Sequence, residues 1–208
     1  MKFGLSIFIL SLTVMVLPCR GDESHDRSRT ILDRMEQARK PKLGVPVKSF
    51  ITKMVSFIPV TEQPLYIDHI FKAPAKIRIV TRVPGAPTVI QAYNGQVAWE
   101  RRGNAPPRLL EDAAADYLRF FALLSNPQAT LNDCFEKIHV APSPVMIDKV
   151  PCHKITGTPA AHFRQLPVVY YVAQSDFLPR RIDMGVFTDG SLSLMTSWFG
   201  TYRNYSGL

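Results

Sequence analysis

The sequence predicts a mainly β (α+β) protein, in which about ten strands form a strongly curved antiparallel sheet or half-open barrel with an N-terminal helix and a lid helix. Three observations predict this fold class. From residue 47 onward, apolar and polar side chains alternate at the period of a strand. Turn residues separate these segments, and Asn94-Gly95 is the strongest hairpin signal among them. Two other segments repeat apolar residues at the helical period instead.

Residues 1–21 have the features of a secretory signal peptide. An apolar run at residues 5–17 follows a positive start, and Cys19-Arg20-Gly21 places small residues where a signal peptidase reads them. The run is shorter than the ~20 residues that cross a bilayer. We expect cleavage after Gly21 and a periplasmic or secreted protein. A lipoprotein anchored through Cys19 is the disfavoured alternative, because Pro18 stands where lipoprotein processing needs a small residue.

The charge of the chain limits the partners that it can have. Its 208 residues include 25 Lys and Arg against 17 Asp and Glu, a net charge of +8. Residues 1–21 hold two of the basic residues and no acidic residue, so the remainder has 23 against 17, a net charge of +6. No basic helix with interleaved aromatic residues is present, and we therefore expect no nucleic acid partner. The positive charge either attracts anionic lipid and acidic envelope partners or forms a solvated surface.

Residues 22–208 are expected to form a single domain. Residues 22–27 are polar and predict a disordered tail, after which Ile31, Leu32, Met35 and Ala38 recur at helical spacing. A second amphipathic helix is predicted from Leu110 to Leu124, with a wide apolar stripe that must lie on the sheet. The expected strands are residues 47–58, 65–71, 77–83, 88–93 and 96–101 before this helix, and 135–140, 151–156, 168–173, 181–187 and 192–199 after it.

Cys134 and Cys152 are the two cysteines outside the signal peptide. They form either a disulfide, which an oxidising compartment allows, or a pair of buried thiols. Cys152 and His153 do not make a catalytic pair, because neighbouring side chains of a strand point to opposite faces. No metal-binding spacing, phosphate loop or nucleophile elbow is present in the sequence. We therefore expect no enzyme, no metal and no cofactor.

Four segments in order resemble the LolA-type periplasmic lipoprotein carriers and the wider superfamily of outer-membrane lipoprotein-sorting proteins. They are the helix at residues 31–38, Phe71-Lys72-Ala73-Pro74-Ala75-Lys76-Ile77-Arg78, Tyr93-Asn94-Gly95-Gln96-Val97-Ala98-Trp99, and Asp176-Phe177-Leu178-Pro179-Arg180-Arg181. The resemblance covers nearly all of residues 28–208. It implies a curved antiparallel sheet around an apolar cavity, with helices as a lid.

The sequence departs from this family at two places. Where the family's carriers have an arginine before the proline that helps to hold the lid shut, this chain has Ala73, which puts a lid-gated transfer cycle in doubt. Family members also continue into at least one more strand after the position of Leu208. We expect either a truncated C-terminus or a short last edge of the sheet.

Aromatic and flexible apolar residues are the candidates for a ligand site, because a cavity for acyl chains needs adaptable apolar walls. Ordinary core packing is the competing interpretation of the same residues. The predicted cavity residues are Phe50, Met54, Phe57, Phe71, Tyr93, Trp99, Tyr117, Phe121, Tyr170 and Trp198.

Two functions remain open at this point. The first is an exported carrier or sensor, a monomer that binds acyl chains of a lipid or lipoprotein, with the envelope membrane or an envelope protein as a further partner. The second is a non-enzymatic protein-interaction module whose core is filled by its own side chains. A carrier needs an apolar cavity and the module needs none.

Overall fold

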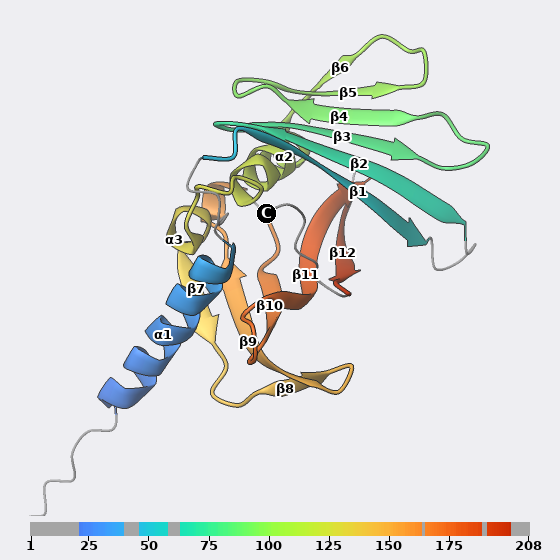
Figure 1. Ribbon diagram of the computed structural model, residues 1–208. Coiled ribbons are helices and arrows are strands. Elements are labelled where there is room, and N and C mark those ends of the chain that lie inside the picture. The colour runs from blue at the N-terminus through green and yellow to red at the C-terminus, as the bar shows by residue number, and fades with distance from the viewer. Residues whose placement is uncertain (1–20, 40–45, 58–62, 164, 189–190, 201–208) are drawn as a thin grey trace, which may run out of the picture.

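The computed structural model describes residues 21–39, 46–57, 63–163, 165–188 and 191–200. In this part of the chain, two six-stranded antiparallel sheets make up most of the fold, with few helices and no closed barrel (Figure 1). The predicted mainly β class is confirmed. The single curved sheet is replaced by two sheets, one on each side of the second helix in the chain. The expected signal peptide, residues 1–21, lies outside the described residues except for Gly21.

The first sheet is a simple meander in chain order. Its register is continuous from one strand to the next, with Phe50 opposite Phe71, Phe71 opposite Ile77 and Ile77 opposite Tyr93. Since opposite residues share a face, these four side chains lie on one side of the sheet. The strands are β1 (Ser49–Phe57), β2 (Pro64–Lys72), β3 (Lys76–Arg82), β4 (Val89–Tyr93), β5 (Ala98–Arg102) and β6 (Arg108–Leu110).

The turn between β4 and β5 shows how local sequence sets this register. Gly95 has a φ of +99°, which a residue without Cβ adopts at little cost. The Asn94 side chain accepts hydrogen bonds from the backbone N–H groups of Gln96 and Val97, both at 2.9 Å. The predicted Asn94-Gly95 hairpin is therefore confirmed, and it fixes which residues of β5 face each side of the sheet.

The second sheet has the order β12-β11-β10-β9-β7, with β8 paired to β9. Its strands are β7 (Lys137–Val140), β8 (Val145–Ile147), β9 (Val150–Thr158), β10 (Val168–Ala173), β11 (Pro179–Thr188) and β12 (Ser191–Trp198), with a short 3-10 turn, η1 (Ala161–Phe163), between β9 and β10. All ten expected strands are present. The short strands β6 and β8 were not expected, because three residues are too few to show an alternation.

Three α-helices accompany the sheets within the described ranges. They are α1 (Gly21–Arg39), α2 (Asp112–Leu124) and α3 (Leu131–Cys134). The predicted disordered tail at residues 22–27 is instead part of α1, a correction to the sequence analysis. Thr130 caps α3 through a reciprocal pair of hydrogen bonds with Asp133, which satisfies N–H groups that the first helical turn leaves without a partner.

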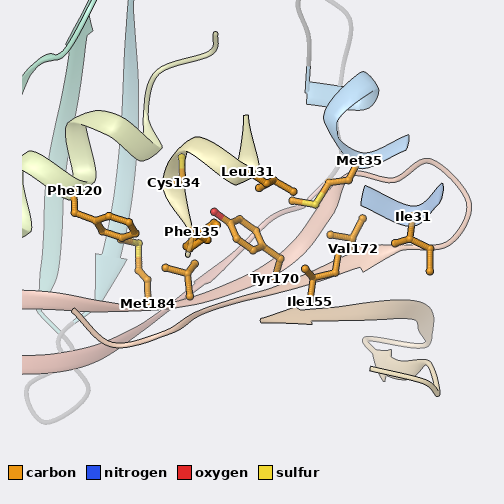
Figure 2. Packing of buried hydrophobic residues seen from close by; sticks show 11 residues of the cluster. Ile31, Met35, Phe120, Leu131, Cys134, Phe135, Ile155, Tyr170, Val172 and Met184 are labelled. Carbon is orange, nitrogen blue, oxygen red and sulfur yellow. The ribbon is translucent and has the colours of Figure 1, made fainter. Parts of the chain in front are cut away.

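The larger core lies on the inner face of the second sheet (Figure 2). Ile31 and Met35 of α1 and residues 131–135 around α3 cover β9, β10 and β11 there. Gly157 of β9 makes room for this core, because a Cβ at that position would lie 2.6 Å from the ring of Phe135. A smaller core joins the inner face of the first sheet to α2.

Candidate functional site

Helix α2 lies between the two sheets and divides the interior of the molecule (Figure 1). Ala115, Leu118 and Ala122 follow one another at helical spacing and are buried against the first sheet, mainly over β3, β4 and β5. Phe120 points into the core of the second sheet, where it contacts Phe135 and Phe163. The predicted helix is confirmed, but its position differs from that of a simple lid, because α2 is buried on two opposite sides.

The inner face of β1 and β2 extends beyond the part of the sheet that α2 covers. We call this surface the β1–β2 strip, and its apolar members are Phe50 and Met54 of β1 and Leu65 and Ile67 of β2. All four side chains are half-buried, whereas Ile77 and Ile79 on the neighbouring strand β3 are buried. Met54 stands directly opposite Ile67 in the register. The strip therefore offers adaptable apolar surface beside the helix rather than beneath it.

His69 lies where the β1–β2 strip meets α2. Its ring stacks on Phe121 of α2, with centroids 4.6 Å apart, and faces the edge of Phe50 at 6.3 Å. Ser125, at the end of α2, places its hydroxyl 3.5 Å from Nε2. Burial lowers the pKa of His69 to about 4, so the imidazole is neutral at pH 7 and behaves as a flat, weakly polar member of the apolar surface.

Aromatic rings continue from His69 in both directions. Tyr117 stacks on Phe121 at 5.6 Å within α2, and Phe50 stacks on Phe71 at 5.3 Å across β1 and β2. Burial raises the pKa of the Tyr117 hydroxyl, which stays protonated. A continuous row of rings thus runs from α2 to β1 and β2, through the stacked and edge-to-face contacts that aromatic pairs prefer.

A buried carboxylate limits the same inner face at its far edge. Glu100 of β5 accepts hydrogen bonds from Arg102 at 2.9 Å, Arg108 at 3.0 Å and Gln91 at 3.0 Å. Burial alone would raise its pKa, but these donors outweigh burial and hold the pKa of Glu100 below its usual value. This side of the inner face therefore carries a paired charged cluster, whereas the half-buried apolar side chains of the β1–β2 strip lie on the other side.

The structure brings six of the ten predicted cavity residues together around the first sheet. Phe50, Met54, Phe71 and Tyr93 lie on its inner face, and Tyr117 and Phe121 of α2 pack against it. Three residues near them, Leu65, Ile67 and His69, were not among the predicted set. The alternation of β2 places these three residues on the same face as Phe71. They were not chosen because the predicted set was drawn from the aromatic and the most flexible apolar side chains.

The other four predicted residues lie elsewhere. Tyr170 belongs to the core of the second sheet, beside Phe135 (Figure 2). Trp99 lies on the outer face of the first sheet, opposite Ala92 and Leu109, and Trp198 on the outer face of the second, with the guanidinium of Arg181 over its ring. These two tryptophans do not share a surface with Phe50, which corrects the expectation of one common cavity. The side chain of Phe57 lies outside the described residues.

The two cysteines of the described residues, Cys134 and Cys152, are buried thiols that are not joined by a disulfide. Cys134 lies in the inner core of the second sheet, whereas Cys152 lies in a small cluster on its other face with Ile147 and Ala173. Of the two alternatives, the structure shows separate thiols rather than a disulfide. Burial raises the pKa of the Cys152 thiol, and His153 packs toward Phe177 on the opposite face of β9.

No helix among the described residues is long and apolar enough to cross a membrane. They also contain no group of three or more His, Cys, Asp or Glu side chains that could hold a metal ion. Ala73, the position of the family's arginine, lies in the turn between β2 and β3, where its N–H donates to the carbonyl of Lys48 at 2.8 Å.

The fold and site define a class of protein with two antiparallel sheets around a buried helix and an apolar inner face. No family model matches the chain, and the search of curated proteins gave no match. Solved structures that are similar to this chain include three with TM-scores below 0.5.

One is a DUF1329 family protein from Desulfovibrio piger, at 12% identity and a TM-score of 0.43 over 83% of this chain and 85% of that one. Another is described as an outer membrane lipoprotein-sorting protein domain, from Vibrio parahaemolyticus. It is 11% identical, with a TM-score of 0.45 over 84% of this chain and 78% of that one. A third is a LolA superfamily protein from Nitrosomonas europaea. It is 16% identical, with a TM-score of 0.41 over 86% of this chain and 80% of that one.

Proposed function

We propose that this protein is a periplasmic carrier or sensor that holds an acyl chain of a lipid or lipoprotein on the β1–β2 strip. The observation that carries the proposal is the half-buried apolar surface of Phe50, Met54, Leu65 and Ile67 beside α2. Ligand surfaces for acyl chains are apolar, adaptable and poor in polar groups, and these residues meet each condition. The sequence resemblance to the LolA-type carriers supports the same function.

The neutral form of His69 adds to this chemistry. A charged imidazole at the edge of an acyl-chain site would need water, whereas a neutral ring stacked on Phe121 does not. The ligand would lie along the β1–β2 strip, with its first methylenes near His69 and its tail over Met54. Export through residues 1–21 would place the protein where such ligands occur.

Native mass spectrometry of protein purified from the cell envelope tests this function. We expect a fraction of the molecules to carry an added lipid mass. A Met54→Asp variant should lose that mass, because a carboxylate on the strip must be desolvated when an acyl chain covers it. Leu194→Asp, at an exposed apolar position on β12, is the matched control and should keep it. Clean apo protein in all preparations would contradict the proposal.

A protein-interaction module with a self-filled core is the second candidate. One observation favours it, namely that Leu118 and Ala122 of α2 are completely buried and fill the space between the sheets. In that case the β1–β2 strip would be the edge of a packed core. Lipid-free protein in the same mass measurement is the result expected for the module.

A further inference from the structure

The outer face of the first sheet carries far more positive charge than its inner face. The register places seven charged side chains on it, six of them basic and one acidic, so the face has a net charge of +5. The basic side chains are exposed, and they are Lys53, Lys72, Lys76, Arg78, Arg82 and Arg101. By the same register, the inner face of these strands carries only the paired cluster around Glu100.

The single acidic residue of this face does not offset the rest. Asp68 is bound by Arg82 in an ion pair, and the hydrogen bond from Arg82 holds the pKa of Asp68 below its usual value. Lys72 and Lys76 stand directly opposite each other across β2 and β3. Two like charges at facing positions repel, and such an arrangement is relieved when an anion binds between or above them.

Apolar side chains are exposed among these cations. Ile51 is 62% exposed, Val55 59% and Leu109 66%, all on the same outer face. An uncovered face of an antiparallel sheet is normally polar, and large exposed apolar residues mark interaction sites. Figure 1 shows that this face points away from α2 and from the second sheet, so nothing among the described residues covers it.

A hollow at the edge of the face completes the pattern. Trp99, Pro107, Arg108 and Leu109 line a pocket of about 280 Å³. The half-buried indole of Trp99 is a group that settles at a boundary between hydrocarbon and water.

We propose that the outer face of β1–β6 docks on the surface of an anionic lipid bilayer. The cations would contact lipid headgroups, and Ile51, Val55 and Leu109 would enter the outermost hydrocarbon. The charges are spread over β1, β2, β3 and β5 rather than gathered in one pocket, which fits a laterally extended anionic surface better than a compact acidic partner. The docking surface lies on the opposite side of the sheet from the β1–β2 strip and does not depend on the acyl-chain function.

Vesicle co-sedimentation tests the docking. Purified protein, shown by intact mass to lack residues 1–21, is mixed with vesicles of phosphatidylcholine alone or with about one third phosphatidylglycerol, a typical anionic content. We expect binding to the anionic vesicles to be at least about tenfold tighter, and to weaken as salt is raised. Equal binding to both vesicles, or none to either, would overturn the proposal.

Charge reversal identifies the face that binds. The double variant Lys76→Glu/Arg101→Glu should lower the affinity for anionic vesicles at least about tenfold, since each basic residue near such a surface contributes about fivefold. Its fold should be retained, because a glutamate at position 76 replaces a repulsive pair with an attractive one. The control Lys137→Glu/Lys149→Glu makes the same change of net charge at two exposed positions elsewhere, one on β7 and one in the turn between β8 and β9. An equal loss in the control would show that net charge alone drives binding and would refute a specific face.

Discussion

Gly157 shows how closely individual side chains fit in the larger core. The ring of Phe135 occupies the space that a Cβ at position 157 would need, and that ring also packs edge to face on Tyr170 at 6.2 Å. The sequence could not reveal this, because a glycine within a strand pattern is also consistent with a bulge or a simple weakness of the strand. The contact depends on a residue 22 positions away in the chain.

We predict that Gly157→Ala lowers the free energy of unfolding by about 1 to 3 kcal/mol, because the ring of Phe135 must move from its packed position. Gly200→Ala, where nothing lies within 4 Å of the added methyl group, should change it by less than about 0.5 kcal/mol. Urea unfolding midpoints measure both variants. Equal midpoints for wild type and Gly157→Ala would mean that the core around Phe135 has unused space.

His69 makes stability depend on pH. The pKa of His69 is about 4 in the folded protein against 6.5 for an ordinary histidine, so the unfolded chain takes up the proton first as pH falls. The contribution of neutral His69 to the free energy of unfolding is fully present above pH 6.5 and is lost as pH falls towards 4. Between pH 7 and pH 5 the expected loss is about 2 kcal/mol.

The variant His69→Gln should therefore be less sensitive to acid than the wild type, because glutamine does not titrate. The measurement is urea unfolding at pH 7 and at pH 5, with His162→Gln at an exposed position as the control. Burial also lowers the pKa of His153, which leaves part of the pH dependence in place. If the free energy of unfolding of His69→Gln fell between pH 7 and pH 5 by as much as that of the wild type, His69 would be accessible to protons in the folded state.

Trp99 illustrates where reasoning from single residues fails. Its strand and hairpin were predicted correctly, but Trp99 was placed among the inward-facing cavity residues as an aromatic side chain just after the Asn94-Gly95 turn. In the structure Ala98 and Glu100 face inward and Trp99 faces outward, where it lines the pocket with Leu109. A bulky apolar residue is a weaker guide to the inside of a sheet than the alternation of its neighbours.

Helix α2 is the element whose role depends most on its surroundings. Its position in the chain and its apolar stripe were evident from the sequence, because the helical period is strong over this segment. The sequence could not tell that the stripe faces two sheets, since a wide apolar stripe fits a lid and a central helix equally well. The division of the strands into two sheets is hidden for the same reason, because pairing partners are not encoded in local alternation.

We predict that the amides of α2 between Tyr117 and Ala122 exchange with solvent as slowly as those of β10. Opening the helix would expose side chains that are buried against both sheets, including Leu118 and Phe120. Hydrogen exchange followed by mass spectrometry measures this in the apo protein and with a lipid or detergent ligand. Fast exchange in α2 that slows on adding ligand would instead support a movable lid, and a cycle of opening would have to be added to the function.

The molecule as a whole presents two different surfaces on one sheet. The inner face of the first sheet offers apolar surface beside α2, and the outer face carries exposed cations among exposed aliphatic side chains. A carrier that takes acyl chains from a membrane or returns them needs both properties, one for the ligand and one for the bilayer. The alternation of the first three strands predicted the two faces, whereas the open and covered parts of the inner face follow from the tertiary position of α2.

The position of the bound chain is the most direct test of this account. A fatty acid with a diazirine in its tail, activated by light in the complex, would attach to the side chains that surround it, and peptide mass spectrometry would locate the adducts. We predict adducts on β1 and β2, at Phe50, Met54, Leu65 or Ile67, and their loss in Met54→Asp. Adducts confined to the outer face around Trp99 and Leu109, or scattered over both sheets, would contradict an acyl-chain site on the β1–β2 strip.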